Sequence, residues 1–362
     1  MPRKFGRKIK RVVIKVGSGI IANFYMKPRA SGLRFIVKEI SNLRKKGIEV
    51  VLVSSGSIVL GLGEIRGHVR PSDVSSLQAL AAIGQNVLMR MYTDQFGKNK
   101  LRCAQVLLTW EDFDERLRYN NARSTINKIL GYGVVPIINE NDTISTDEIK
   151  FGDNDKLSAL VASLIGADLL LILSDVDGLY NLKDKDKKVF KEIKEITKEI
   201  ENLALGTTRK NVSKGGMVTK IEAVKIATHA KIPCVIANGN TRNIVRDVVN
   251  GKQVGTFFVE KEEKLLARRH WISFGAKPKG KLVVDRGAKE ALLKGGKSLL
   301  LPGVVSWEGH FKKEDVVIIV DQADLEIARG IINYSVGDLH KIDDKKHKME
   351  VVHCSDMVLC QR

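Results

Sequence analysis

Apolar runs of strand length alternate with amphipathic segments of helix length from Lys10 to about Glu260, and this alternation constrains the fold more than any other feature. The runs are short, rich in Val, Ile and Leu, and nearly continuous in apolar character, which is typical of parallel strands covered on both faces. They lie at residues 12–16, 50–53, 103–108, 134–138, 169–173 and 233–237. We therefore predict an α/β fold, a three-layer αβα sandwich with a mainly parallel sheet.

The character of the chain changes after Glu260. Residues 263–279 are charged and then rich in Gly, Pro and Lys, which predicts a linker. Beyond them, short apolar runs separated by Gly-containing turns predict a small β-rich domain. We expect an α/β domain over residues 1–262 and the β-rich domain over residues 280–362.

Composition excludes several classes of protein. No apolar run approaches the roughly 20 residues that a membrane-spanning helix needs, and the N-terminus MPRKFGRK lacks the apolar region of a signal peptide, so we expect a cytoplasmic protein. The four cysteines show neither CxxC spacing nor a matching His pair, and we expect them to be reduced. The net charge of +19 comes from cations spread along the chain, which gives little support for a dedicated RNA surface.

Two clusters of Asn and Asp indicate a polar small-molecule site. Residues 139–142 leave the carboxyl end of a buried strand, where open α/β sheets bind ligands. Residues 153–155 open a helix, which we expect Asp153 or Asn154 to cap. Either cluster alone is common turn chemistry, whereas the two together favour a binding site.

Lys15 lies in an apolar strand immediately before a Gly-Ser-Gly turn. Burying a lysine is costly unless an anion meets it, and glycine N–H groups can approach phosphate oxygens, so the pattern fits a phosphate site. A lysine at a strand end that reaches solvent is an equal alternative. The segment is not a Walker loop, since no GxxxxGK[ST] is present. No EF-hand or HExxH pattern occurs, so we predict no metal cage within the protein, and the lack of a nucleophile elbow argues against covalent hydrolysis.

A second Gly-Lys segment, residues 214–220, opens another helix. Its Gly-Gly pair leaves N–H groups free at the helix start, which suits an anion. On these residues alone, a flexible turn with Lys220 on a solvated face is the better explanation. Ser174 and Asp175 leave a third buried strand and are candidates for contacts with a nucleotide.

Taken in this order, the motifs resemble those of the amino acid kinase family, in its branch that phosphorylates glutamate and carries a C-terminal PUA domain. INEND and GDND are the most specific motifs, because kinases of acetylglutamate, carbamate, aspartate and uridylate share mainly the first lysine and the glycines. The matching motifs are VIKVGS at 13–18, SSG at 54–56, INEND at 138–142, GDND at 152–155 with LSAL at 157–160, SD at 174–175 with GLY at 178–180, and GGMVTK at 215–220. The PUA part rests on residues 280–287, 299–304 and 328–330.

The resemblance implies transfer of the ATP γ-phosphoryl group to the side-chain carboxylate of L-glutamate, the first step toward proline, with Mg²⁺ on the ATP phosphates. Lys15 and Lys220 would hold the phosphoryl group in flight, and Asp155 would orient the two lysines. The residues that bind glutamate would be Ser55, Asp142 and Asn154. Those that bind ATP would be Lys15, Ser174, Asp175, Lys214, Gly215, Gly216, Met217, Val218, Thr219 and Lys220.

Three positions depart from the family pattern. Ser57 stands where an Ala is usual, Lys214 replaces a Thr, and Cys354 replaces an Arg. The resemblance further implies inhibition by proline, for which we expect the loop at 143–150, and a homodimer or homotetramer. PUA modules bind RNA in other proteins, but we expect a structural or modulatory role here.

A glutamate kinase has two alternatives, one within the enzymes and one from a different class of protein. One is a kinase of another small carboxylate, which a comparison of substrates would separate. The other is an RNA-binding or regulatory protein with an inactive kinase fold. Intact Lys15, Asp155 and Lys220 argue against the second, because a silenced site has no need of two lysines that face one anion.

Overall fold

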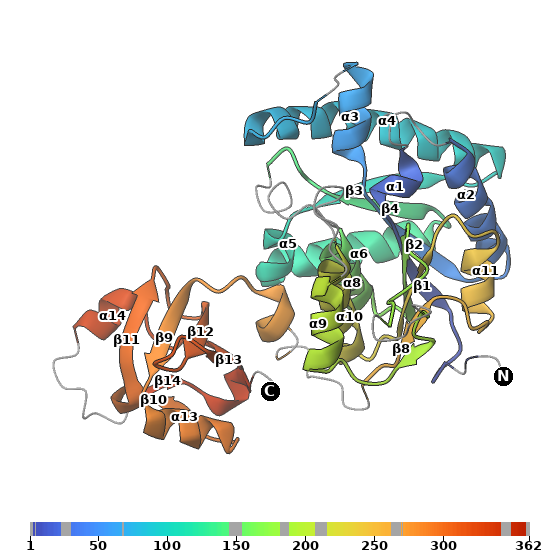
Figure 1. Ribbon diagram of the computed structural model, residues 1–362. Coiled ribbons are helices and arrows are strands. Elements are labelled where there is room, and N and C mark those ends of the chain that lie inside the picture. The colour runs from blue at the N-terminus through green and yellow to red at the C-terminus, as the bar shows by residue number, and fades with distance from the viewer. Residues whose placement is uncertain are drawn as a thin grey trace. The chain divides into compact units, whose positions relative to one another are not determined.

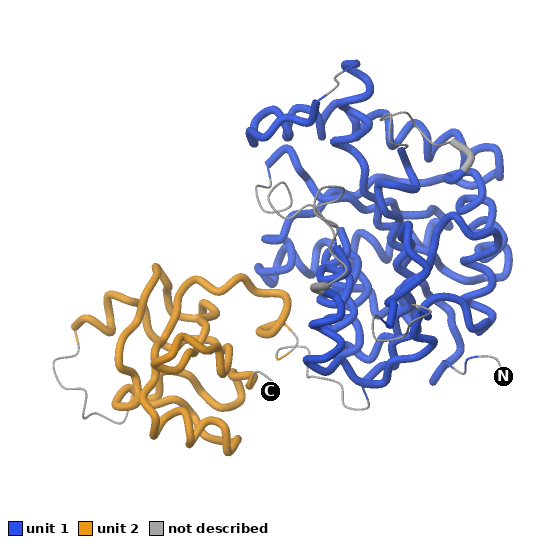
Figure 2. Tube along the Cα trace, in the orientation of Figure 1, with its two compact units in different colours: residues 1–264 blue, residues 265–362 orange. Residues whose placement is uncertain are grey.

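The computed structural model describes the chain except for residues 1, 2, 4, 23–29, 67–68, 145–153, 182–187, 207–215, 262–268, 270, 342–348 and 360–362. The chain forms two compact units, residues 1–264 and 265–362 (Figure 2). Among the described helices, none combines the length and the apolar character that crossing a membrane requires.

The first unit is built on an eight-stranded sheet in the order β3-β4-β2-β1-β5-β7-β8-β6. Its strands are β1 Arg11–Val16, β2 Glu49–Ser54, β3 Cys103–Leu108, β4 Val135–Glu140, β5 Leu169–Ser174, β6 Glu192–Ile193, β7 Cys234–Asn238 and β8 Thr256–Phe258. Neighbouring strands pair in parallel, apart from the antiparallel pair of β7 and β8. The predicted mainly parallel sheet is confirmed, although β6 and β8 were not predicted.

Helices cover both faces of this sheet (Figure 1). One layer contains α1 Ser18–Ile21, α2 Ala30–Lys45, α4 Val74–Lys98 and α11 Ile244–Val249, and the other contains α6 Arg116–Gly131, α8 Asp155–Ile165 and α10 Met217–His229. Three further helices, α3 Ser57–Glu64, α5 Glu111–Asp114 and α9 Lys198–Gly206, pack on α4, α6 and α10 respectively. The predicted three-layer αβα sandwich is confirmed.

Because side chains alternate along β1, Lys15 points toward one particular helix layer. Val12, Ile14 and Val16 belong to the apolar core that includes α2. Because successive side chains of a strand point to opposite faces, Val13 and Lys15 face the other layer, which holds α8 and α10. A lysine in β1 thus points toward two helix starts.

The central strand β1 is also the point where the strand order reverses, with β2 on one side and β5 on the other. Val16, its last residue, pairs with Ser54 of β2 and is preceded by Lys15, which pairs with Ile172 of β5. The carboxyl ends of three strands therefore lie side by side. Open α/β sheets bind ligands at such a reversal.

Helices α3 and α4 cross with their backbones in contact. A Cβ atom at Gly84 would clash with the carbonyl oxygen of Ser57, and one at Gly61 would clash with that of Leu80. Only glycine fits at a crossing this close. The crossing places Gln85, the residue after Gly84, next to the start of α3.

The second unit has its own apolar core around a five-stranded sheet, in the order β11-β9-β12-β13-β15. Its elements are η1 Trp271–Gly275, β9 Gly280–Val284, α13 Arg286–Leu293, β10 Leu299–Leu300, η2 Leu301–Gly303, β11 Val304–Gly309, β12 Val316–Val320, β13 Glu326–Ile331, α14 Val336–His340, β14 Glu350–Val352, η3 Cys354–Asp356 and β15 Met357–Leu359. The predicted β-rich second fold is confirmed. Within the segment predicted as a linker, η1 is a π-helix whose Ile272 is buried against Val316 and Ile331.

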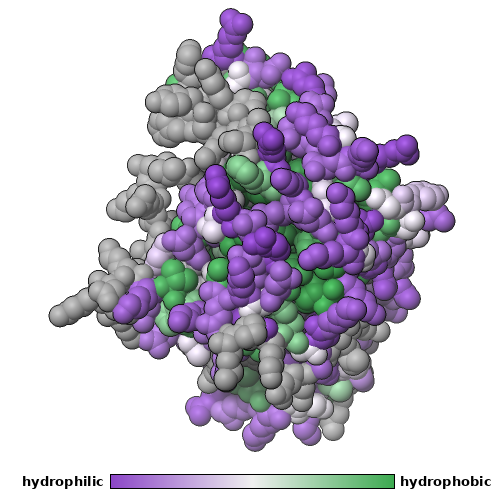
Figure 3. Space-filling view, turned by 90° about the vertical axis from the view of Figure 1, so that its right-hand side faces the viewer, coloured by the Kyte–Doolittle hydropathy of each residue, from purple (hydrophilic) through white to green (hydrophobic). Residues whose placement is uncertain are grey.

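The residues visible in Figure 3 are mainly hydrophilic, and the hydrophobic ones gather in separate groups. Some large apolar side chains are exposed, such as Phe35 of α2, which is 49% exposed. The guanidinium of Arg242 lies 5.9 Å from the centre of the Phe35 ring. Apolar atoms make up a large part of any protein surface, so exposure of this kind is ordinary.

Candidate active site

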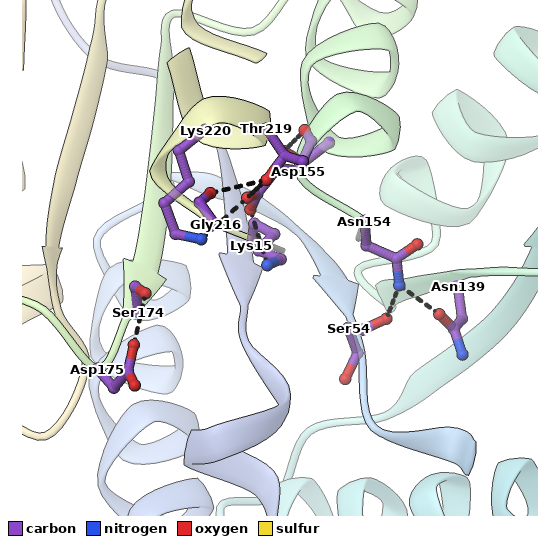
Figure 4. A network of polar contacts seen from close by, with 11 residues as sticks. Lys15, Ser54, Asn139, Asn154, Asp155, Ser174, Asp175, Gly216, Thr219 and Lys220 are labelled. Atoms are coloured by element: carbon purple, nitrogen blue, oxygen red, sulfur yellow. Dashed lines mark hydrogen bonds and ion pairs between the residues drawn. The ribbon is translucent and has the colours of Figure 1, made fainter. Parts of the chain in front are cut away.

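Two lysines from distant parts of the chain meet one buried carboxylate (Figure 4). Lys15 Nζ lies 2.7 Å from Asp155 Oδ1, and Lys220 Nζ lies 3.1 Å from Asp155 Oδ2. Asp155 is fully buried, while Lys15 and Lys220 are 3% and 5% exposed. Two alternatives placed these side chains in solvent, Lys15 at a strand end and Lys220 on an exposed helix face. Both alternatives are therefore wrong.

The three charged groups are held by the starts of two helices. Asp155 is the first residue of α8, and Lys220 lies in the first turn of α10. The Thr219 hydroxyl donates to Asp155 Oδ2 at 3.0 Å and also lies 2.9 Å from the carbonyl oxygen of Gly216. Because Thr219 and Lys220 both contact Asp155, the start of α10 is tied to the start of α8.

This cluster has an excess of positive charge in a buried place. Two ammonium groups share one carboxylate, so these three side chains together carry one net positive charge. Burying such a charge is costly unless an anion arrives to balance it. The geometry therefore suits a phosphate group that binds both lysines.

A thiol lies near the cluster but does not fit a nucleophile. Burial raises the pKa of Cys234 well above its usual value, and the negative charge of Asp155 raises it further. A thiol with such a pKa stays protonated at neutral pH, whereas the thiolate is the nucleophile. Cys234 is therefore a poor candidate for a catalytic role.

On one side of Lys15 lie the predicted nucleotide contacts. Ser174, the last residue of β5, is buried, and its hydroxyl donates to Asp175 Oδ1 at 3.1 Å. Asp175 is exposed beyond the strand end. The predicted residues Met217, Val218 and Thr219 form the first turn of α10, whereas Lys214 and Gly215 lie outside the described residues.

On the other side of Lys15 lie the predicted glutamate contacts. Asn154 Nδ2 donates to the carbonyl oxygen of Ser54 at 2.5 Å and to Asn139 Oδ1 at 2.6 Å. Asn154 precedes α8 as expected, but its own side chain does not cap the helix, and Asp153, the other predicted cap, lies outside the described residues. The side chain of Asn154 instead joins β2 to β4.

Some polar atoms on this side are buried and have no hydrogen-bond partner within the described part of the chain. They include Asn154 Oδ1 and Ser55 Oγ. Buried polar atoms are nearly always hydrogen-bonded, so exceptions call for an explanation. Because both belong to residues predicted to bind glutamate, a bound ligand is the simplest partner.

Asp142 lies at the same end of the sheet, two residues after β4. It is buried, and Ser57 Oγ donates to its Oδ2 at 3.1 Å. Ser57 is the position at which the family usually has Ala, so here the departure adds a hydroxyl bond to a predicted substrate contact. Sequence reasoning noted Ser57 but did not foresee this bond.

Sequence reasoning missed the roles of two further side chains. Asn139 Nδ2 donates to Gln85 Oε1 at 2.8 Å, which links β4 to helix α4. Asn139 stood in the INEND motif, so its presence near the site could have been foreseen. Gln85 lies inside a long helix, and the sequence around it does not indicate a role at the site.

Comparison with known proteins places this geometry in a family. The model of the amino acid kinase family matches residues 10–238, which include both lysines and Asp155. The chain belongs to the amino acid kinase family. A PUA domain model matches residues 280–354 of this amino acid kinase. The predicted family and its PUA module are thus confirmed.

Relatives of this amino acid kinase match it over nearly its full length. Proteins named Glutamate 5-kinase from Thermoanaerobacter sp. (strain X514) and Carboxydothermus hydrogenoformans are each 42% identical to it, over 97% and 99% of this chain and 98% and 99% of their own. One of the same name from Syntrophotalea carbinolica is 43% identical, over 97% of this chain and 98% of its own. The predicted branch of the family is therefore confirmed as well.

Proposed function

We propose that this amino acid kinase transfers the γ-phosphoryl group of ATP to the side-chain carboxylate of L-glutamate. The products are ADP and L-glutamyl 5-phosphate, and the step is the first toward proline. The observation that carries the proposal is the buried cluster of Lys15, Asp155 and Lys220 at the strand-order reversal. Relatives named Glutamate 5-kinase support glutamate as the acceptor.

The reaction needs positioning and charge neutralisation more than acid–base catalysis. A carboxylate oxygen of glutamate attacks the γ-phosphorus, a new O–P bond forms, and the bond to the bridging oxygen of ADP breaks. The attacking group is already ionised, so no base has to remove a proton. Lys15 and Lys220 bring the two anions together and offset the charge on the transferred group. Asp155 holds both lysines in place.

Glutamate occupies the side of Lys15 that faces β2 and β4. The Asp142 carboxylate pairs with the α-ammonium group, to which Asn154 Oδ1 offers a second acceptor. Ser55 Oγ can donate to a substrate carboxylate. These three residues supply complementary groups for an amino acid, which a simple carboxylate would leave partly unused.

ATP occupies the opposite side, between β5 and the start of α10. The first turn of this 13-residue helix leaves N–H groups unpaired within the helix, and they suit phosphate oxygens. Ser174 and Asp175 would contact the nucleoside, and Lys214 with Gly215 and Gly216 would complete the phosphate loop.

Mg²⁺ would arrive with the nucleotide and would neutralise part of the charge on its phosphates. The described residues offer no group of three His, Cys, Asp or Glu side chains that could hold a metal ion. This donor set fits an ion held mainly by phosphate oxygens and water.

A comparison of acceptors tests the proposal. Release of ADP from Mg-ATP is followed with L-glutamate, L-aspartate and N-acetyl-L-glutamate at equal concentrations. We expect release that depends on L-glutamate and is much slower with the other two. Faster turnover of N-acetylglutamate or aspartate would show that the site serves another carboxylate.

We further propose that proline inhibits the enzyme at or near the glutamate site, and that the enzyme is a homodimer or homotetramer. The loop proposed for inhibition, residues 143–150, lies outside the described residues from 145 onward. Substitutions in this loop should change the proline concentration that halves the activity. Unchanged sensitivity to proline in active loop variants would contradict a role of this loop in inhibition. A monomer in sedimentation would contradict the proposed homodimer or homotetramer.

For the PUA domain we propose a structural or modulatory role rather than RNA binding. Its sheet packs on a core of its own, which includes Leu282, Val317 and Val351. The full-length protein should then bind RNA only weakly at physiological salt, with no sequence preference. Tight, sequence-dependent binding under those conditions would overturn this proposal.

A further inference from the structure

Three side-chain amides form a continuous hydrogen-bonded relay that runs from β2 to helix α4. Asn154 Nδ2 donates to the Ser54 carbonyl oxygen at 2.5 Å and to Asn139 Oδ1 at 2.6 Å. Asn139 Nδ2 donates in turn to Gln85 Oε1 at 2.8 Å. The relay therefore spans two strands and one helix on the side of Lys15 where we propose that glutamate binds.

The direction of the whole relay follows from one backbone atom. The Ser54 carbonyl oxygen can only accept a hydrogen bond, so the atom of Asn154 that faces it is the nitrogen. This nitrogen also faces Asn139, which must present its oxygen. The nitrogen of Asn139 then points to Gln85, which must present Oε1. Each amide then has one orientation that satisfies its neighbours in the relay, and Gln85 Nε2 at the far end is buried without a partner among the described residues.

The relay thereby determines what Asn154 offers to a ligand. With its nitrogen directed at Ser54 and Asn139, its carbonyl oxygen remains, buried and without a partner among the described residues. An acceptor of this kind suits the ammonium group of an amino acid. Without the acceptor that Asn139 provides, the nitrogen of Asn154 would keep only the Ser54 carbonyl, and the carbonyl oxygen of Asn154 would be held toward the ligand less firmly.

Gln85 lies at the far end of the relay and is held there by the helix crossing. Gly84, the residue before it, touches the backbone of α3 at Ser57. Ser57 in turn donates to Asp142 at 3.1 Å. The same crossing thus places both Gln85 and the hydroxyl that contacts Asp142.

We propose that Gln85 is a positioning residue for the glutamate site, which acts through Asn139 to keep the carbonyl oxygen of Asn154 toward the substrate. This inference rests on the proposed binding of glutamate by Asn154. Without Gln85 Oε1, the buried nitrogen of Asn139 loses its acceptor, so the Asn139 amide is less firmly fixed and one of the two acceptors that orient Asn154 is weakened.

A double-mutant cycle tests the proposal in the full-length enzyme. Gln85→Met keeps the length of the side chain and removes both polar atoms. In the otherwise native enzyme we expect kcat/KM for glutamate to fall about tenfold, with KM for ATP within twofold of its native value. In an Asn154→Ala background we expect Gln85→Met to change kcat/KM for glutamate less than twofold, because its target is gone.

The matched control is Gln95→Met, at a buried glutamine on the same helix. It should leave kcat/KM for glutamate unchanged. Equal losses from Gln85→Met in both backgrounds would overturn the proposal, since they would mean direct contact with substrate or general damage to the fold. So would a native kcat/KM in folded Gln85→Met enzyme.

The cycle also separates this inference from the function on which it rests. Absence of glutamate-dependent turnover in the native enzyme would contradict the proposed function itself. A native kcat/KM for glutamate in Asn154→Ala would contradict the role of Asn154 and, with it, the relay. Failure of the coupling alone would overturn only the role of Gln85.

Discussion

Lys15 Nζ and Asp155 Oδ1 lie 2.7 Å apart at the end of the central strand, with both side chains almost wholly buried. The second oxygen of Asp155 faces Lys220 at 3.1 Å. One carboxylate thus holds together two ammonium groups that would otherwise repel each other. Because the lysines are already in place, little reorganisation is needed when a phosphoryl group arrives.

Removal of either lysine should impair the chemical step more than binding of glutamate. For Lys15→Met and Lys220→Met we expect kcat to fall about 10²–10³-fold, the effect of losing one group that stabilises charge in a transition state. KM for glutamate should change only a few-fold. Steady-state kinetics of both variants check this.

The matched control for these lysines is Lys156→Met. Lys156 follows Asp155 in the chain, but its side chain is 42% exposed and pairs with Glu222 on the surface. Its removal should leave kcat unchanged. A loss in this variant as large as that in Lys15→Met would mean that general charge, rather than placement, matters.

Asp155→Asn should destabilise the fold as well as the site. It removes the negative charge that both buried ammonium groups contact, and breaking a buried ion pair from one side costs about 3–5 kcal/mol in the free energy of unfolding. Denaturant unfolding monitored by circular dichroism measures this cost. Adding Lys220→Met should recover part of the stability, since only one buried cation then remains. Native stability in Asp155→Asn would contradict the account of this cluster.

Ser57→Ala tests the bond that this chain adds to the family pattern. The hydroxyl of Ser57 donates to Asp142 at 3.1 Å and helps to hold the carboxylate that we assign to the α-ammonium group. Its loss should raise KM for glutamate about fivefold, as expected for one hydrogen bond, and leave KM for ATP unchanged. An unaltered KM for glutamate would show that Asp142 needs no such support.

Glu39 of α2 should make stability depend on pH. Burial raises its pKa above the usual value, although hydrogen bonds from the backbone N–H groups of Arg246 and Val245 lower it in part. Because the pKa of Glu39 is higher in the folded state, the contribution of Glu39 to the free energy of unfolding is fully present below the unfolded pKa of 4.5. This contribution is lost as the pH rises through the folded pKa.

The comparison of Glu39→Gln with the native enzyme isolates this effect, because other titrating groups cancel. We expect the variant to gain thermal stability relative to the native protein as pH rises from about 4.5 to 7. Melting temperatures at several pH values provide the measurement. A difference between the two proteins that does not vary with pH would exclude a raised pKa of Glu39.

The sequence was sufficient for the sheet because buried parallel strands leave nearly continuous apolar runs. The predicted run at 103–108 coincides with β3, and the other main runs differ from their strands by one or two residues at an end. Strands β6 and β8, of two and three residues, are too short to show any pattern. The π-helix η1 was not predicted, because it lies in a segment whose Gly, Pro and Lys content is typical of linkers.

The polar site was less accessible from the sequence, because its contacts join distant segments. The burial of Lys220 depends on Asp155, 65 residues away, and a solvated helix face was the better reading of the local pattern. Asn154 stood at the expected helix start, yet tertiary acceptors on β2 and β4 replaced the capping bond. Gln85 has its role only because α3 and α4 cross at glycines.

The central claim is that this enzyme forms an acyl phosphate on the side chain of glutamate. The most direct measurement incubates the purified protein with Mg-ATP, L-glutamate and hydroxylamine, which traps the acyl phosphate as a hydroxamate that mass spectrometry can locate. We predict an ATP-dependent γ-hydroxamate that Lys15→Met and Lys220→Met greatly reduce. No hydroxamate from glutamate, in folded protein that still binds ATP, would contradict the claim.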